Sequence, residues 1–256
     1  MGTGDTMNWF FAVYMFIIGS ILGSFLTLVG MRIPLGKKIT GRSYCDQCEM
    51  TIPWVGLIPI VGYFLVKGKC RHCKQKVSMR YPVLEFLSGA LFFFGYLYLH
   101  DNVIEYVVTM FFVSMMLTLT VSDIEHRLVP NSIMLAFLPF LLALRMTETF
   151  IPWYMSLLGA LAGFLFMVLV AWYGKKRFKQ EAMGGGDIKL YALVGLFLGI
   201  ELVFLSLFFA AVTALLTGRT LLRNMNPIPF VPFIFAGSVL AYVFGPTLLE
   251  WYMGLF

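Results

Sequence analysis

Met183-Gly184-Gly185-Gly186-Asp187-Ile188-Lys189-Leu190 leads directly into an apolar run that ends at residue 199. The carboxylate of Asp187 is therefore expected at the mouth of a membrane-embedded segment, where an acid is costly to desolvate and a functional role is the first hypothesis. Gly184 and Gly186 would let a second backbone or a substrate approach closely. The plainer alternative is that Asp187 only N-caps the helix that follows.

Composition points to an all-α polytopic membrane protein. Of its 256 residues 60% are hydrophobic and only 12% are charged, with a mean hydropathy of +0.85, and a soluble domain of this size could not bury so much apolar surface. About eight transmembrane helices are predicted, at residues 8–30, 81–99, 103–121, 129–144, 152–173, 188–199, 201–216 and 228–250. The sixth would reach only about 18 Å across a ~30 Å hydrocarbon core, so it must extend, bend or lie in thinned bilayer.

The distribution of basic residues predicts the orientation. Among the 19 Lys and Arg, only Arg145 falls on one face of the expected topology. The positive-inside rule makes the other face cytoplasmic and leaves both termini outside. We therefore attribute the net charge of +6 to topology and to contact with anionic lipid headgroups, and we expect no nucleic-acid partner.

The sequence predicts an amino-terminal region, residues 7–100, and a membrane domain, residues 101–256. The first holds a cytoplasmic loop, residues 32–80, with all four cysteines: Cys45, Cys48, Cys70 and Cys73. Two C-x-x-C pairs separated by 21 residues are typical of a tetrahedral four-thiolate zinc site, which is structural because no ligand position stays open. A redox pair, two disulfides, or His72 as a competing ligand are the alternatives.

The stretch between the two cysteine pairs is too apolar for a solvated linker. It is expected to pack on the cysteine pairs or to lie in the membrane interface. Its apolar residues are Trp54, Leu57, Ile58, Pro59, Ile60 and Tyr63.

A second acid, Asp123, ends the third apolar segment and so lies at the same membrane face as Asp187. Two such carboxylates can share one proton, so that one activates a water and the other polarises a carbonyl group. This chemistry is aspartyl peptide hydrolysis. Nearby, Glu125 and His126 are expected to be solvated, with a proton relay through His126 as the alternative. Lys189 is expected to pair with a carboxylate or with a lipid phosphate.

These motifs together resemble the type IV prepilin peptidase family of GxGD-type intramembrane aspartyl proteases. Asp123 is followed seven residues later by Pro130, and residues 184–190 match the family's G-x-G-D-x-K-L pattern. The chain departs from the family at Thr27 and Val231, where Asn and Gly are usual. Further matches are Gly23-Ser24-Phe25-Leu26, Arg32-Ile33-Pro34, both cysteine pairs, Gly68-Lys69-Cys70-Arg71, Arg80-Tyr81-Pro82 with Glu85, and Ile228-Pro229-Phe230-Val231-Pro232-Phe233.

The resemblance implies a bacterial inner-membrane enzyme with Asp123 and Asp187 as catalytic residues. It would remove the short basic leader of a prepilin or pseudopilin at the cytoplasmic face. Many members also methylate the new amino terminus with S-adenosylmethionine, and Glu85 is expected either to serve the substrate or methyl transfer, or to pair with a loop Arg or Lys. A transporter or channel with a structural zinc module, and a membrane scaffold, are the competing classes.

Overall fold

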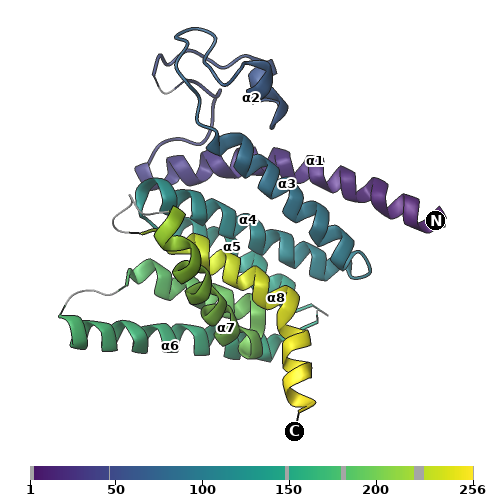
Figure 1. Ribbon diagram of the computed structural model, residues 1–256, viewed down its shortest axis with the longest axis vertical. Coiled ribbons are helices and arrows are strands. Elements are labelled where there is room, and N and C mark those ends of the chain that lie inside the picture. The colour runs from purple at the N-terminus through teal and green to yellow at the C-terminus, as the bar shows by residue number, and fades with distance from the viewer. Residues whose placement is uncertain (1–2, 46, 148–149, 180–182, 222–227, 256) are drawn as a thin grey trace. The chain divides into compact units, whose positions relative to one another are not determined.

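A computed structural model describes residues 3–45, 47–147, 150–179, 183–221 and 228–255 (Figure 1). Within these ranges the chain is helical, with two isolated β-bridges and no strand. It divides into two compact units, Met1–Tyr106 and Val107–Phe256. In chain order the elements are α1 (Thr3–Arg32), η1 (Ile33–Leu35), η2 (Trp54–Leu57), α2 (Val61–Leu65), α3 (Arg80–Leu99), α4 (Val103–His126), α5 (Asn131–Arg145), α6 (Trp153–Phe178), α7 (Gly185–Leu221) and α8 (Val231–Met253).

Six described helices are long and apolar enough to cross a membrane: α1, α3, α4, α6, α7 and α8. The apolar α5 is shorter. Within α7, Gly199 has φ 74° and ψ 175°, a backbone conformation that interrupts the helix. A Cβ on Gly163 of α6 would lie 2.7 Å from the carbonyl oxygen of Tyr191 and 3.0 Å from Val203 Cγ2.

A straight helix would hold Tyr191 and Val203 about 18 Å apart, so the two halves of α7 fold back on each other at Gly199. The expected sixth and seventh segments are these two halves. The prediction of an all-α fold with about eight apolar helical segments is confirmed. The short sixth segment gains length by extending backward to Gly185.

Glycines let α6 and the first half of α7 approach closely. A Cβ on Gly195 would collide with the carbonyl oxygen of Gly159, and one on Gly159 would lie 2.5 Å from the carbonyl carbon of Gly199. Small residues four apart on both helices, as in Gly159 with Gly163 and Gly195 with Gly199, are the usual means of close packing between membrane helices. The spacing is present in the sequence but was not part of the prediction.

Replacement of Gly195 by Ala is expected to force α6 and α7 apart and to destabilise the second unit by about 1–3 kcal/mol. Thermal unfolding in detergent measures this, with Gly185→Ala as the control because a Cβ there meets nothing within 4 Å. Equal unfolding temperatures for the two variants would contradict the packing described.

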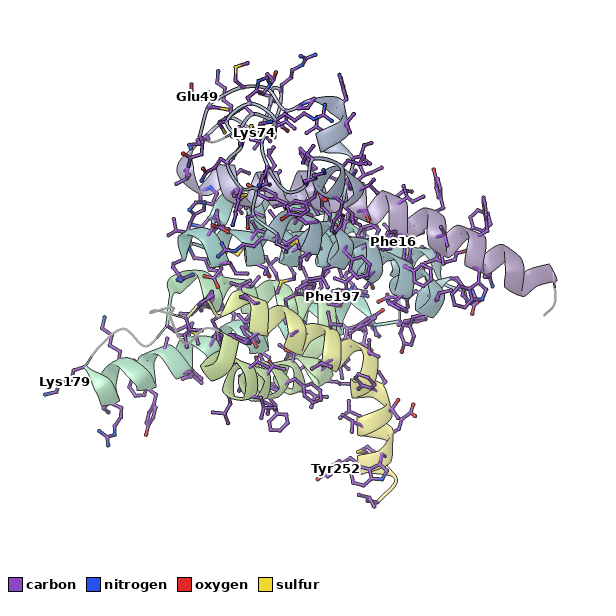
Figure 2. All side chains as sticks on the ribbon, turned by 45° about the horizontal axis from the view of Figure 1, so that its top comes forward. Phe16, Glu49, Lys74, Lys179, Phe197 and Tyr252 are labelled. Carbon is purple, nitrogen blue, oxygen red and sulfur yellow. The ribbon has the colours of Figure 1, made fainter. Side chains whose placement is uncertain are left out.

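Arg145, the exception to the expected charge bias, is buried at the end of α5 with 1% of its surface exposed. Its guanidinium donates a hydrogen bond to the carbonyl oxygen of Phe197 and lies 5.1 Å from the centroid of that ring. The last carbonyl groups of a helix lack partners within the helix, so the cation caps the first half of α7. Phe197, which is labelled in Figure 2, also stacks on Phe112, with ring centroids 3.9 Å apart.

In the first unit, α1 and α3 pack through small residues in the same way. A Cβ on Gly19 would lie 2.7 Å from Phe92 Cβ, and one on Gly23 would lie 2.5 Å from Ser88 Cβ. The chain between these helices forms the cysteine loop, in which the β-bridges Tyr44↔Thr51 and Lys69↔Lys76 each close one C-x-x-C pair.

Candidate functional site

Asp123 lies in the last turn of α4, which continues to His126. The third segment, which was predicted to end near residue 121, therefore continues as a helix for about one more turn. Asp123 is 7% exposed, and its Oδ2 accepts a hydrogen bond of 2.9 Å from the backbone N–H of Val231. The N–H of Phe230 is a second backbone donor. The amino terminus of α8 is thus directed at this carboxylate, an arrangement that favours negative charge.

The end of α4 is fixed by the residues just after Asp123. Arg127 has a left-handed backbone, φ 57°, and its N–H donates to the Asp123 carbonyl oxygen at 3.0 Å. Its guanidinium donates to the carbonyl oxygen of Ile124 at 2.9 Å, so one side chain caps the helix. Ser122 Oγ donates to the carbonyl oxygen of Leu128 at 2.6 Å. These contacts hold the backbone that carries Asp123.

Asp187 is half-buried and is the third residue of α7, whose first residue is Gly185. Its own N–H bonds to the carbonyl oxygen of Gly184 at 3.1 Å, so Asp187 lies inside the first turn and not at the N-cap. The carboxyl groups of Asp187 and Asp123 are close enough to interact electrostatically. The structure therefore places the two acids that the sequence singled out within electrostatic range of each other.

Of the three consecutive glycines before Asp187, only Gly186 lies where a side chain would collide with a neighbouring segment. A Cβ on Gly186 would lie 2.6 Å from Val129 Cβ, in the segment that joins α4 to α5. At Gly184 the nearest atom would be Asp187 Oδ2 at 3.6 Å, and at Gly185 there is open space. Gly186 therefore allows the start of α7 to lie directly against the segment that follows Asp123.

Lys189 supplies a second link between the same two segments. Its Nζ donates to Asn131 Oδ1 at 3.2 Å, so the partner shown for Lys189 is an amide. Asn131 is the first residue of α5 and follows Pro130. Beside Asp123, Glu125 is exposed and His126 is half-buried at the end of α4.

Replacement of Gly186 by Ala is expected to push the start of α7 away from Val129 and to separate the two carboxylates. The cost of such overpacking is about 1–3 kcal/mol, and the catalytic rate should fall while the protein still folds. The matched control is Gly185→Ala, which adds the same methyl group into open space. Cleavage rates of the two variants measure the effect, and equal rates would show that the contact with Val129 does not position Asp187.

The four cysteines gather in the first unit as a metal-binding group. Their sulfur atoms all lie within 4.8 Å of one another. The Sγ atoms of Cys45 and Cys73 are 3.8 Å apart, and those of Cys48 and Cys70 are 3.9 Å apart. A tetrahedral zinc site with Zn–S bonds of about 2.3 Å has edges of about 3.8 Å, so the two S–S distances given already match such a site.

The surroundings of the cluster shift the pKa values of two of its thiols in opposite directions. Backbone hydrogen bonds from Cys73 and His72 lower the pKa of the Cys70 thiol to about 7. Although a backbone hydrogen bond from Gln75 lowers the pKa of Cys73, desolvation and the neighbouring sulfurs raise it to about 11. Four thiolates this close repel one another, and a central divalent cation would remove that repulsion. Among the described residues the cluster comprises the cysteines alone, and His72 is exposed.

Glu85 is buried on α3, and the partner that the structure shows is in the cysteine loop. Its Oε2 accepts a hydrogen bond of 2.6 Å from the backbone N–H of Ile60. Ile60 has φ 62° and ψ −62°, and the N–H of Val61 bonds to the carbonyl oxygen of Pro59 across it, which is a tight turn that a β-branched residue adopts only under strain. Glu85 therefore binds the main chain of the loop, and the partner shown is neither an Arg nor a Lys. A role of Glu85 toward the substrate or methyl transfer stays a prediction.

Two profiles of known protein families match this chain, and together they cover most of its length. The profile of the bacterial peptidase A24 N-terminal domain matches residues 17–99, and that of the type IV leader peptidase family matches residues 110–219. A prepilin leader peptidase/N-methyltransferase of Bacillus subtilis is 38% identical over 93% of this chain and 96% of its own length. Proteins of the same name from Myxococcus xanthus and Klebsiella pneumoniae are each 33% identical, over 83% and 73% of this chain and 63% and 84% of their own lengths. No solved structure is significantly similar to the chain.

Proposed function

Because this chain belongs to the type IV leader peptidase family, we propose that it is a membrane-embedded aspartyl endopeptidase that removes the leader of type IV prepilins or pilin-like proteins. The observation that supports this proposal most directly is the pairing of Asp123 with Asp187, from segments 64 residues apart. Two acids that interact in a partly buried site are what water activation without a covalent intermediate requires.

In the proposed reaction the two carboxyl groups share one proton. We assign the carboxylate form to Asp123, because the N–H groups of Val231 and Phe230 at the start of α8 favour its negative charge. Asp123 takes a proton from water, and the resulting hydroxide attacks the scissile carbonyl carbon while protonated Asp187 donates to the carbonyl oxygen. Asp123 then passes its proton to the leaving amine as the C–N bond breaks, and Asp187 recovers its proton as the new carboxyl group forms.

The proposed site lies at the cytoplasmic face of a bacterial inner membrane. Both acids lie near ends of apolar helices, Asp123 in the last turn of α4 and Asp187 in the first turn of α7. Of the basic residues, 18 of 19 are expected on this face, which leaves both termini outside. A prepilin would keep its basic leader in the cytosol and its apolar helix in the bilayer, so that the bond between them meets the acids.

Methylation of the new amino terminus is the second proposed activity. The names of the relatives include an N-methyltransferase, for which S-adenosylmethionine is the proposed methyl donor. The four-cysteine cluster is proposed to bind structural zinc, because four sulfur ligands leave no position for water or substrate. Cys45, Cys48, Cys70 and Cys73 would then fix the loop between α1 and α3.

The test is mass spectrometry of a prepilin expressed together with this chain in a bacterium that lacks leader peptidase activity. We expect cleavage after the last residue of the leader, a glycine, so that the product has lost the whole leader. We also expect the product to be 14 Da heavier at the new amino terminus, which is the mass of one added methylene group. An unprocessed substrate would overturn the peptidase assignment. A cleaved but unmethylated product would overturn the methyl transfer alone.

A further inference from the structure

The cysteine loop exposes apolar side chains that no described part of the protein covers. We call them the apolar tip: Trp54, Val55, Leu57, Ile58, Val61, Phe64 and Leu65. Trp54 is 79% exposed, Phe64 is 61% exposed and Leu65 is 55% exposed. Large apolar side chains grouped in this way mark a surface that contacts a membrane or a partner.

The opposite side of the same segment is engaged by the loop itself. Gly62 is buried, and a Cβ there would lie 2.8 Å from the carbonyl oxygen of Val55. Tyr63 is half-buried, donates a hydrogen bond to the carbonyl oxygen of Val77, and packs against Gly68, two residues before the second cysteine pair. The segment thus has one face folded onto the loop and one apolar face directed away from it.

The hydrogen bond between Ile60 and Glu85 fixes the apolar tip at one level along α3. Glu85 is five residues into α3, or about 7.5 Å from its start, and the 20-residue α3 is itself about as long as the ~30 Å hydrocarbon core. The strained backbone of Ile60 is fixed to that level by a buried carboxylate.

The charged residues next to the apolar tip also fit a position at the membrane surface. Lys67 and Lys69 follow α2 directly, and both side chains are exposed. An apolar face bordered by lysines is typical of segments that lie in the headgroup layer of an anionic bilayer, with the apolar side about 5–10 Å below the surface. With the start of α3 at the membrane surface, as in the proposed topology, the level of Glu85 falls within this range.

We propose that the apolar tip inserts into the interfacial layer of the bilayer, so that the zinc loop is a membrane-bound module held beside α3. Glu85 is its positioning residue, acting through the N–H of Ile60. This surface is separate from the peptidase chemistry, and its occupant is lipid.

Fluorescence of Trp54 in vesicles tests the proposal. The full-length protein carries Phe in place of its other four tryptophans, Trp9, Trp153, Trp172 and Trp251. It is reconstituted in phosphatidylcholine and phosphatidylglycerol vesicles whose acyl chains are brominated either near the headgroup or near the chain end. We expect blue-shifted emission, strong quenching by the shallow bromines, weaker quenching by the deep ones and little quenching by aqueous acrylamide.

The matched control carries Gln75→Trp, at an exposed position two residues after the second cysteine pair, together with Trp54→Phe. It should be quenched by acrylamide and not by brominated lipid. For Trp54, quenching by acrylamide alone would place the apolar tip in water, and quenching by neither reagent would place it against protein. Either result overturns the proposal.

A second pair of variants isolates Glu85. Glu85→Ala removes the acceptor for the Ile60 N–H, and lipid quenching of Trp54 should fall, whereas Glu85→Gln keeps an acceptor oxygen and should preserve the quenching. Zinc content is measured in parallel, because retained metal shows that the loop itself is still folded. Equal lipid quenching in both variants would remove Glu85 from the proposal.

Discussion

Replacement of Asp123 or Asp187 by Asn is expected to lower the rate of prepilin cleavage by about 10²–10⁴-fold, with little change in folding. Asn has nearly the shape of Asp but can neither take a proton from water nor return one to the leaving amine. Because the two carboxylates act as one unit, the double variant should be hardly slower than either single variant. Rates of cleavage in membranes or proteoliposomes measure the effect.

Glu125→Gln is the matched control for these variants. It neutralises an exposed carboxylate on the same turn of α4, two residues from Asp123, and should cleave at the rate of the parent protein. Normal processing by both Asp variants would refute the catalytic role of the pair. If only one Asp mattered, water activation would depend on a single carboxylate, and the shared-proton scheme would be wrong.

Removal of zinc is expected to unfold the cysteine loop. The apparent binding free energy of structural zinc sites is about 10–16 kcal/mol, and the loop between α1 and α3 has little other core. Replacement of Cys48 by Ser should therefore abolish metal binding and make residues 36–79 sensitive to protease. Metal content by mass spectrometry and limited proteolysis in detergent measure the two effects.

His72→Ala is the control for the metal site. His72 lies between Cys70 and Cys73 but outside the cluster of sulfur atoms among the described residues, so this variant should retain one zinc per chain. Loss of zinc from His72→Ala would show that the imidazole is a ligand. Retention of zinc by Cys48→Ser would show that four thiolates are not required.

The features that could be predicted from the sequence are those that residue type and spacing alone determine: the cysteine ligand set, the two acids and the apolar helical segments. The C-x-x-C pairs determine a ligand set whatever the surrounding fold, and an acid next to an apolar segment is costly enough to mark a site. Long apolar runs likewise gave the helical segments, including the two halves of α7.

The features that were missed depend on contacts between distant segments. Nothing local in residues 228–233 indicates that the Val231 N–H meets Asp123, because that contact requires α8 to begin beside the last turn of α4. The capping of α4 by Arg127 was not predicted, although a basic residue after a helix is a recognisable capping signal. Lys189 was expected to meet an anion, and its partner Asn131 comes from the packing of Gly186 against Val129.

The contact between Arg145 and Phe197 has a consequence for how the chain enters the membrane. Arg145 is the one basic residue that the proposed topology requires the cell to export, and translocation of positive charge opposes insertion in that orientation. The substitution Arg145→Met would ease export of the α5–α6 connection. It would also remove the hydrogen bond that Arg145 donates to the carbonyl oxygen of Phe197 at the end of the first half of α7. A variant selected for efficient insertion would therefore be less stable once inserted. At this position, the amount of protein that reaches the membrane and the lifetime of the folded protein there are opposed.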